Sequence, residues 1–72
     1  MTDGEVRKVD RDTGRITIRH GEIKNLAMPP MTMVFRVRDP SLLNRVAEGG
    51  RVRFMAERID GAFTVTALEA AN

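Results

Sequence analysis

Alternating apolar and polar residues predict that most of the chain forms short β-strands. The alternation is strict over residues 15–20, where one face carries Ile16, Ile18 and His20. It resumes over residues 31–37, where one face carries Met31, Met33, Phe35 and Val37. A period of two is typical of strands with one buried face. Shorter patterns of the same kind predict three more strands, at Val6 and Val9, at Val52, Phe54 and Ala56, and at Phe63, Val65 and Ala67.

Turn residues and one helix signal separate these strands. Residues 10–14 and the pair Asp60-Gly61 predict hairpin turns. Residues 21–30 predict a connecting loop that is extended and unpaired, or lies at a sheet edge, because the Pro29-Pro30 pair at its end has no N–H donors. The only helix candidate is residues 39–46, where Asp39 can cap the helix and Pro40 suits its first position.

This order of elements predicts an all-β fold: a small five-stranded Greek-key barrel of the OB type, with one short helix between strands 3 and 4. Five short strands with a continuous apolar face usually close on themselves, since two alone would not be stable. An SH3-like barrel is the alternative. A chain of 72 residues has room for one small core, so we expect a single domain over residues 1–72.

Composition excludes several classes of function. The absence of cysteine excludes disulfides and thiolate metal sites. Twelve basic and ten acidic residues alternate in sign, so the net charge of +2 gives little support for nucleic-acid binding. No apolar run approaches the roughly 18 residues of a membrane helix, and the first residues carry no signal-peptide core. With one histidine and no glycine-rich phosphate loop, we do not expect an enzyme.

Methionine is concentrated in one segment, because three of the five methionines lie in residues 28–35, MPPMTMVF. Met31 and Met33 leave the same face of their strand, roughly 7 Å apart along the backbone. Thioethers are soft donors that select Cu(I), and by the same softness Ag(I). If the strand at 15–20 pairs antiparallel with the strand at 31–37, His20 meets the start of the methionine strand. We therefore predict a soft-metal site of His20, Met31 and Met33 at one rim of the barrel, which loses affinity when His20 is protonated.

Other interpretations of these residues stay open. A methionine pair on a strand is most often core packing, although a core is better filled by Leu, Ile or Val. An OB-fold domain that binds single-stranded nucleic acid is the main alternative function, and it would need aromatic platforms and a basic groove. The chain has three Phe and no Tyr or Trp. A third possibility is a docking module whose methionines form an adaptable contact surface.

The segments ITIRH at 16–20 and MPPMTMVF at 28–35 resemble the CusF-type periplasmic copper/silver-binding domain. The likeness extends to Gly4-Glu5-Val6, the turn at 10–14, the segment Gly49-Gly50-Arg51-Val52 and the Asp60-Gly61 turn. The resemblance implies an OB-type barrel that binds one Cu(I) or Ag(I) ion, with His20, Met31 and Met33 at the family's three ligand positions. It also implies a monomer in the periplasm, either a free metallochaperone or the C-terminal domain of a membrane fusion protein. Such a domain passes the ion to the membrane fusion protein and inner-membrane pump of a tripartite cation efflux system, and neither spans the membrane nor binds nucleic acid.

Met28 departs from the family pattern. The best-known members carry a tryptophan there, whose indole covers the metal by a cation–π contact, and this chain has no tryptophan. Two roles are therefore open for Met28: an apolar lid over the ion, or a fourth ligand through its sulfur. We expect its sulfur to approach the ion in some fraction of the bound state.

Overall fold

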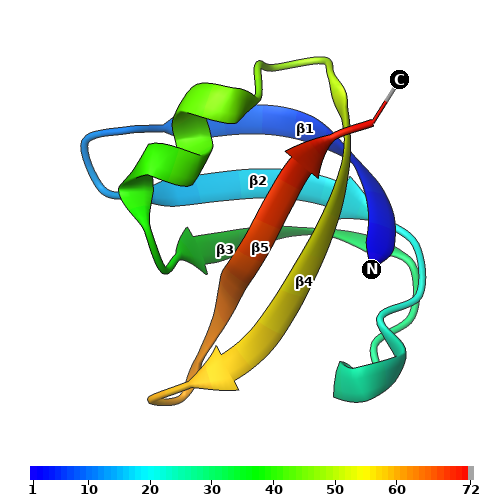
Figure 1. The fold of residues 1–72 in the computed structure, drawn as a ribbon. Coiled ribbons are helices and arrows are strands. Elements are labelled where there is room, and N and C mark those ends of the chain that lie inside the picture. Colours follow the sequence, from blue (N-terminus) through cyan, green and yellow to red (C-terminus); the bar gives the residue numbers. More distant parts are fainter. Residues whose placement is uncertain (72) are drawn as a thin grey trace.

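The computed structural model describes residues 1–71, which form a closed five-stranded barrel (Figure 1). Its strands are β1 (Thr2–Asp10), β2 (Arg15–His20), β3 (Met31–Val37), β4 (Arg51–Ile59) and β5 (Ala62–Ala70). Their order around the barrel is β1-β2-β3-β5-β4, and β4 pairs with β1 to close it. Every pairing is antiparallel except β3 with β5. The predicted all-β, OB-type barrel is confirmed.

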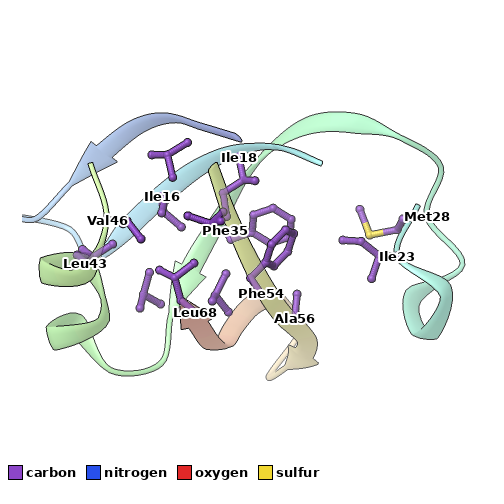
Figure 2. Close-up of a cluster of buried hydrophobic side chains, with 14 residues drawn as sticks. Ile16, Ile18, Ile23, Met28, Phe35, Leu43, Val46, Phe54, Ala56 and Leu68 are labelled. Atoms are coloured by element: carbon purple, nitrogen blue, oxygen red, sulfur yellow. The ribbon is translucent and has the colours of Figure 1, made fainter. Parts of the chain in front are cut away.

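The barrel interior is filled by the inward-facing side chains of the alternating strands. Phe35 of β3 and Phe54 of β4 are fully buried, with ring centroids 5.5 Å apart. Figure 2 shows the core as one elongated cluster, with Leu43 and Val46 at one end and Ile23 and Met28 at the other. Both ends of the barrel are therefore covered by residues from the connections between strands.

Each of these two connections contains a short 3₁₀ helix. The helix η2 (Pro40–Arg45) begins after Asp39, whose side chain accepts a hydrogen bond of 3.0 Å from the Ser41 backbone N–H. It buries Leu43, so the predicted short helix between strands 3 and 4 is confirmed. The expectation that residues 21–30 are extended and unpaired, or lie at a sheet edge, is wrong for residues 23–28. They contain the helix η1 (Lys24–Leu26), which ends at Ala27 in the left-handed conformation, φ 53°.

Residues 21–30 fold back on themselves because Ile23 and Met28 pair as an isolated antiparallel bridge. Their backbones exchange two hydrogen bonds, of 3.0 and 3.1 Å, and both side chains are buried. Asn25 then fastens the segment to β4 by donating to the Ala56 carbonyl over 2.9 Å. The turn and the bridge involve residues 23–28 and end before Pro29 and Pro30, which lie in neither.

The last strand departs from the predicted face pattern. A register shift at Met55/Ala56 of β4 places Ala67 opposite Met55 and Val65 opposite Ala56, so Thr66 is an extra residue on β5. Such a bulge switches the side chains beyond it to the other face. Leu68 is therefore buried in place of Ala67, which was expected to share the face of Val65.

Among the described residues 1–71, no helix is long and apolar enough to cross a membrane.

Candidate metal centre

The hairpin of β2 and β3 brings the predicted ligand residues to one end of the barrel. In the antiparallel register His20 lies opposite Met31, and Ile18 lies opposite Met33. Residues opposite each other in such a ladder project their side chains from the same face, with Cα atoms roughly 4.5–5.5 Å apart. His20, Met31 and Met33 therefore share the inward face at the same end of the sheet, as their spacing predicted. Whether they bind metal stays a prediction.

His20 is the most unusual group in this cluster, because it is a titratable side chain with only 3% of its surface exposed. Its Nδ1 lies 2.7 Å from the Gly21 carbonyl oxygen. A carbonyl only accepts, so Nδ1 carries the proton of the neutral ring and Nε2 carries the lone pair. That Nε2 is buried and has no hydrogen-bond partner among residues 1–71. Buried polar atoms without partners are rare and call for an explanation, such as an absent ion.

Aromatic rings hold the imidazole in this orientation. The His20 ring makes edge contacts with Phe35 and Phe54, at centroid distances of 5.5 and 6.2 Å. A metal-binding histidine usually donates its other N–H to a carbonyl or carboxylate, which fixes the tautomer and the ring orientation. The Gly21 carbonyl already fills that role. The ring is therefore held with its Nε2 lone pair unused and buried.

Gly4 of β1 makes room for this arrangement. It lies opposite His20 in the β1–β2 ladder and faces inward. A Cβ at this position would lie 2.5 Å from Ile18 Cγ2 and 3.2 Å from Phe54 Cε1. Only glycine lets β1 approach these side chains so closely. The sequence contained this residue in Gly4-Glu5-Val6, but nothing there indicated that it faces the histidine.

The two methionines are the more accessible part of the cluster. Met31 is 42% exposed at the first position of β3, while Met33 is partly buried and packs against the core. An open hollow of about 410 Å³ reaches His20, Gly21 and Pro30, and neither methionine lines it. Methionine side chains are long and flexible, so the two thioethers can change position without rearranging the barrel.

Met28 has a different environment from Met31 and Met33. It is 9% exposed, and Figure 2 shows its sulfur next to Ile23 at the end of the core cluster. Its backbone is held by the bridge to Ile23. The structure thus places Met28 as an apolar cover in the segment that follows His20, and its role toward an ion stays open.

The described residues offer few other groups that could bind a metal ion or a nucleic acid. No group of three or more His, Cys, Asp or Glu residues within residues 1–71 could hold a metal ion. Phe35 and Phe54 are buried, and the Arg58 guanidinium lies 5.0 Å above the Phe63 ring. Phe35 and Phe54 therefore offer no open face on which bases could stack as in OB domains, and one face of Phe63 is covered. Thioethers and one imidazole are therefore the donors to consider.

Solved structures of one Escherichia coli protein have the same fold as this chain. Apo-CusF superimposes with a TM-score of 0.82 at 21% identity, covering 99% of this chain and 84% of that one. CusF with Ag(I) gives the same score and identity, covering 99% and 89% of the two chains. A tryptophan-to-alanine variant of CusF with Cu(II) superimposes with a TM-score of 0.78, again at 21% identity and with coverages of 99% and 89%. No curated protein sequence matches the chain.

The family assignment comes from the sequence itself. Residues 1–70 match the family model described as "Copper binding periplasmic protein CusF". This match spans nearly the whole chain and agrees with the barrel topology and with the resemblance in residues 16–20 and 28–35. The chain belongs to the CusF family.

Proposed function

We propose that this domain binds one Cu(I) or Ag(I) ion at the mouth of the barrel formed by His20, Met31 and Met33. The ion is cargo that the domain carries, and no chemical transformation is involved. His20 supplies Nε2, and the two thioethers supply soft sulfur donors that favour monovalent copper and silver over harder divalent ions. None of these donors is a thiol, so the site can operate in an oxidising compartment without forming disulfides.

The observation that carries the proposal is the buried Nε2 of His20, which lacks a hydrogen-bond partner and lies in the residue opposite Met31. A structural histidine in the core would be expected to satisfy both ring nitrogens, since leaving one unsatisfied costs about 1–3 kcal/mol. Metal binding would supply the missing partner. The fold that the chain shares with the Ag(I) form of Escherichia coli CusF is consistent with this role.

We further propose that the domain works in the periplasm and passes its ion to the membrane fusion protein and inner-membrane pump of a tripartite cation efflux system. The family description names a periplasmic copper-binding protein. Thioether ligation is weaker than thiolate ligation, and Met31 is exposed, so an incoming ligand from a partner could displace it. A monomer is expected, and size-exclusion chromatography with and without Ag(I) tests that.

The direct test is titration of the purified domain with Ag(I) nitrate, followed by NMR of the methionine methyls and the imidazole. One equivalent should shift the methyls of Met31 and Met33 and the His20 ring signals in slow or intermediate exchange. The methyl of Met55, which is 49% exposed on β4, is the internal control and should not move. Protons compete for Nε2, so affinity should fall in mildly acidic solution. A domain that ignores Ag(I), or whose affinity is the same from neutral to mildly acidic pH, would contradict the proposal.

Met28 is a candidate fourth ligand. The variant Met28→Leu keeps an apolar side chain of similar size, so a covering role survives it and a coordinating role does not. We expect weaker Ag(I) binding, by severalfold, if the Met28 sulfur coordinates in part of the population. Unchanged affinity would limit Met28 to shielding the ion, and the matched variant Met55→Leu controls for nonspecific loss of a thioether.

A further inference from the structure

We propose that the outer face of β2 and β3, at the end away from the metal mouth, is a docking site for an extended acidic segment of a partner protein. The surface, named here the basic face, consists of Arg15, Val34 and Arg36 on these two strands, together with Lys8 of β1 and Phe63 of β5 beside them. The proposal does not depend on metal binding, because none of these residues belongs to the mouth.

The first observation is a pair of like charges that the fold brings together. Arg15 and Arg36 lie directly opposite each other in the β2–β3 ladder, and both are exposed. Like charges in this arrangement destabilise a sheet. Neither forms an ion pair within residues 1–71, although Asp10 lies opposite Arg15 on β1. Asp10 instead accepts a hydrogen bond from the Thr13 backbone N–H.

The second observation is an exposed apolar residue beside this pair of charges, Val34, which lies opposite Thr17 in the same ladder. Val34 is 57% exposed, which is the largest exposure among the large apolar residues of the described strands. It stands between two open hollows. One, of about 160 Å³, is lined by Lys8, Asp10, Arg15, Thr17 and Val34. The other, of about 260 Å³, is lined by Arg15, Val34, Phe35, Arg36, Ala62 and Phe63.

The third observation is a free strand edge beside Val34. The parallel ladder between β3 and β5 contains two residue pairs, Arg36 with Thr64 and Val37 with Val65. Residues 31–35 of β3 lie outside that ladder, and within the described chain no other strand pairs with this edge. Val34 and Phe35 adjoin the basic face, whereas Met31 and Met33 belong to the metal mouth. Free edges are the usual docking place for extended peptides, which add as a strand and fix their side chains in pockets on the adjacent face.

These features together specify the partner's chemistry. Carboxylates would pair with the two guanidinium groups, and an apolar side chain would cover Val34 and the exposed part of Phe63. Arg58, 5.0 Å above the Phe63 ring, adds a further cation at the rim. A nucleic acid fits less well, because Phe35 and Phe54 are buried and Arg58 lies over one face of Phe63, so the described chain offers no set of open rings for stacking.

The basic face and the metal mouth lie at opposite ends of the same two strands. Arg15 and His20 are the first and last residues of β2, so their backbones are roughly 17 Å apart at about 3.3 Å per residue. A partner that pairs only beside Val34 and Phe35 and stops short of Met33 would therefore leave the mouth free to exchange an ion. Docking and metal transfer could then be altered separately by mutation.

The test uses the purified domain without metal and a fluorescent peptide of alternating glutamate and valine. We expect binding that weakens with salt, and amide shifts that concentrate on residues 15–17 and 34–36. The double variant Arg15→Gln/Arg36→Gln should weaken it about tenfold, which corresponds to about 1.4 kcal/mol. The matched variant Arg51→Gln/Arg53→Gln removes the same charge from β4 and should change the affinity by less than about twofold.

Three outcomes would overturn the proposal. The first is no binding of the peptide, and the second is an equal loss of affinity in both double variants, which would indicate attraction by net charge alone. The third is tighter binding of oligo(dT) than of the peptide at the same residues, which would assign the face to single-stranded nucleic acid. The variant Arg15→Gln should also leave the domain at least as stable as the wild type, since it removes one of two opposed like charges.

Discussion

Replacing His20 with leucine should separate the cost of this residue to the fold from its benefit to metal binding. Leucine fills a similar volume and has no polar atom. The change removes the buried Nε2 that lacks a partner, which relieves about 1–3 kcal/mol, and it removes the Nδ1–H hydrogen bond to Gly21, which loses about 0.5–1.5 kcal/mol. The contacts of the aliphatic side chain with Phe35 and Phe54 take the place of the ring-edge contacts. We therefore expect His20→Leu to stabilise the metal-free domain by about 1 kcal/mol.

Ag(I) should reverse the relative stability of the wild type and the His20→Leu variant. At a free Ag(I) concentration of about one hundred times the dissociation constant, the wild type gains about 2.7 kcal/mol from binding, while the variant gains little. The wild type should then be the more stable of the two by between about 1 and 2 kcal/mol. For a domain of this size, 1 kcal/mol corresponds to a change of about 4–8 °C in the midpoint of thermal unfolding.

Urea denaturation followed by far-UV circular dichroism measures both quantities. The chain has no Trp or Tyr, so fluorescence is a poor probe, and nitrate buffers avoid precipitating silver chloride. Met55→Leu serves as the control, because it removes an exposed thioether from β4 and should respond to Ag(I) as the wild type does. If His20→Leu lowers the stability of the metal-free domain by more than about 2 kcal/mol, or if Ag(I) stabilises it as much as the wild type, the reasoning about the free nitrogen is wrong.

Three further substitutions test other parts of the structure. Gly4→Ala places a Cβ 2.5 Å from Ile18 Cγ2, so it should cost about 1–3 kcal/mol in urea denaturation and weaken Ag(I) binding; an unchanged midpoint would contradict the close approach. Asn25→Ala removes the 2.9 Å hydrogen bond to Ala56, so amide exchange in residues 21–30 should become severalfold faster while the strands stay protected; uniform exchange rates would argue against local release. The pKa of Asp39 is held below its ordinary value of 3.8 by backbone and side-chain hydrogen bonds from Ser41, so its contribution to stability is present above that value and is lost as pH falls through the folded-state pKa. The variant Asp39→Asn, which keeps a capping side chain, should therefore show a weaker loss of stability in acid, and identical acid profiles would exclude this contribution.

Strands with strict alternation could be predicted to the residue. The expected bounds of β2 and β3, residues 15–20 and 31–37, are those of the structure, because each strand turns one whole face to the closed interior. The buried faces of the strands with bulges could not be predicted in this way. β1 shifts register between Val6 and Lys8, and β5 gains an extra residue at Thr66, so each pattern changes phase partway. A bulge depends on the partner strand, and the sequence of one strand carries no signal for it.

The strand pairing that brings the candidate ligands together could be predicted from the sequence, but the environment of their side chains could not. The hairpin that pairs β2 with β3 follows from the alternating patterns, and it places His20 opposite Met31. The state of the imidazole depends on the direction of the Gly21 carbonyl, which belongs to a loop with no periodic pattern. The burial of Met28 likewise depends on its bridge to Ile23. This local pairing was not expected in a loop that ends in two prolines.

The position of β1 between β2 and β4 has a consequence for how the chain folds. Its first half must pair both with the neighbouring β2 and with residues 51–54 near the other end of the sequence. Contacts between such distant segments slow folding, because a long loop has to close before they can form. During synthesis the meander of the first three strands therefore leaves the ribosome with two open edges, and the last hairpin has to emerge before either is covered. Ring closure is a late step, and the nascent chain is most exposed to aggregation just before it.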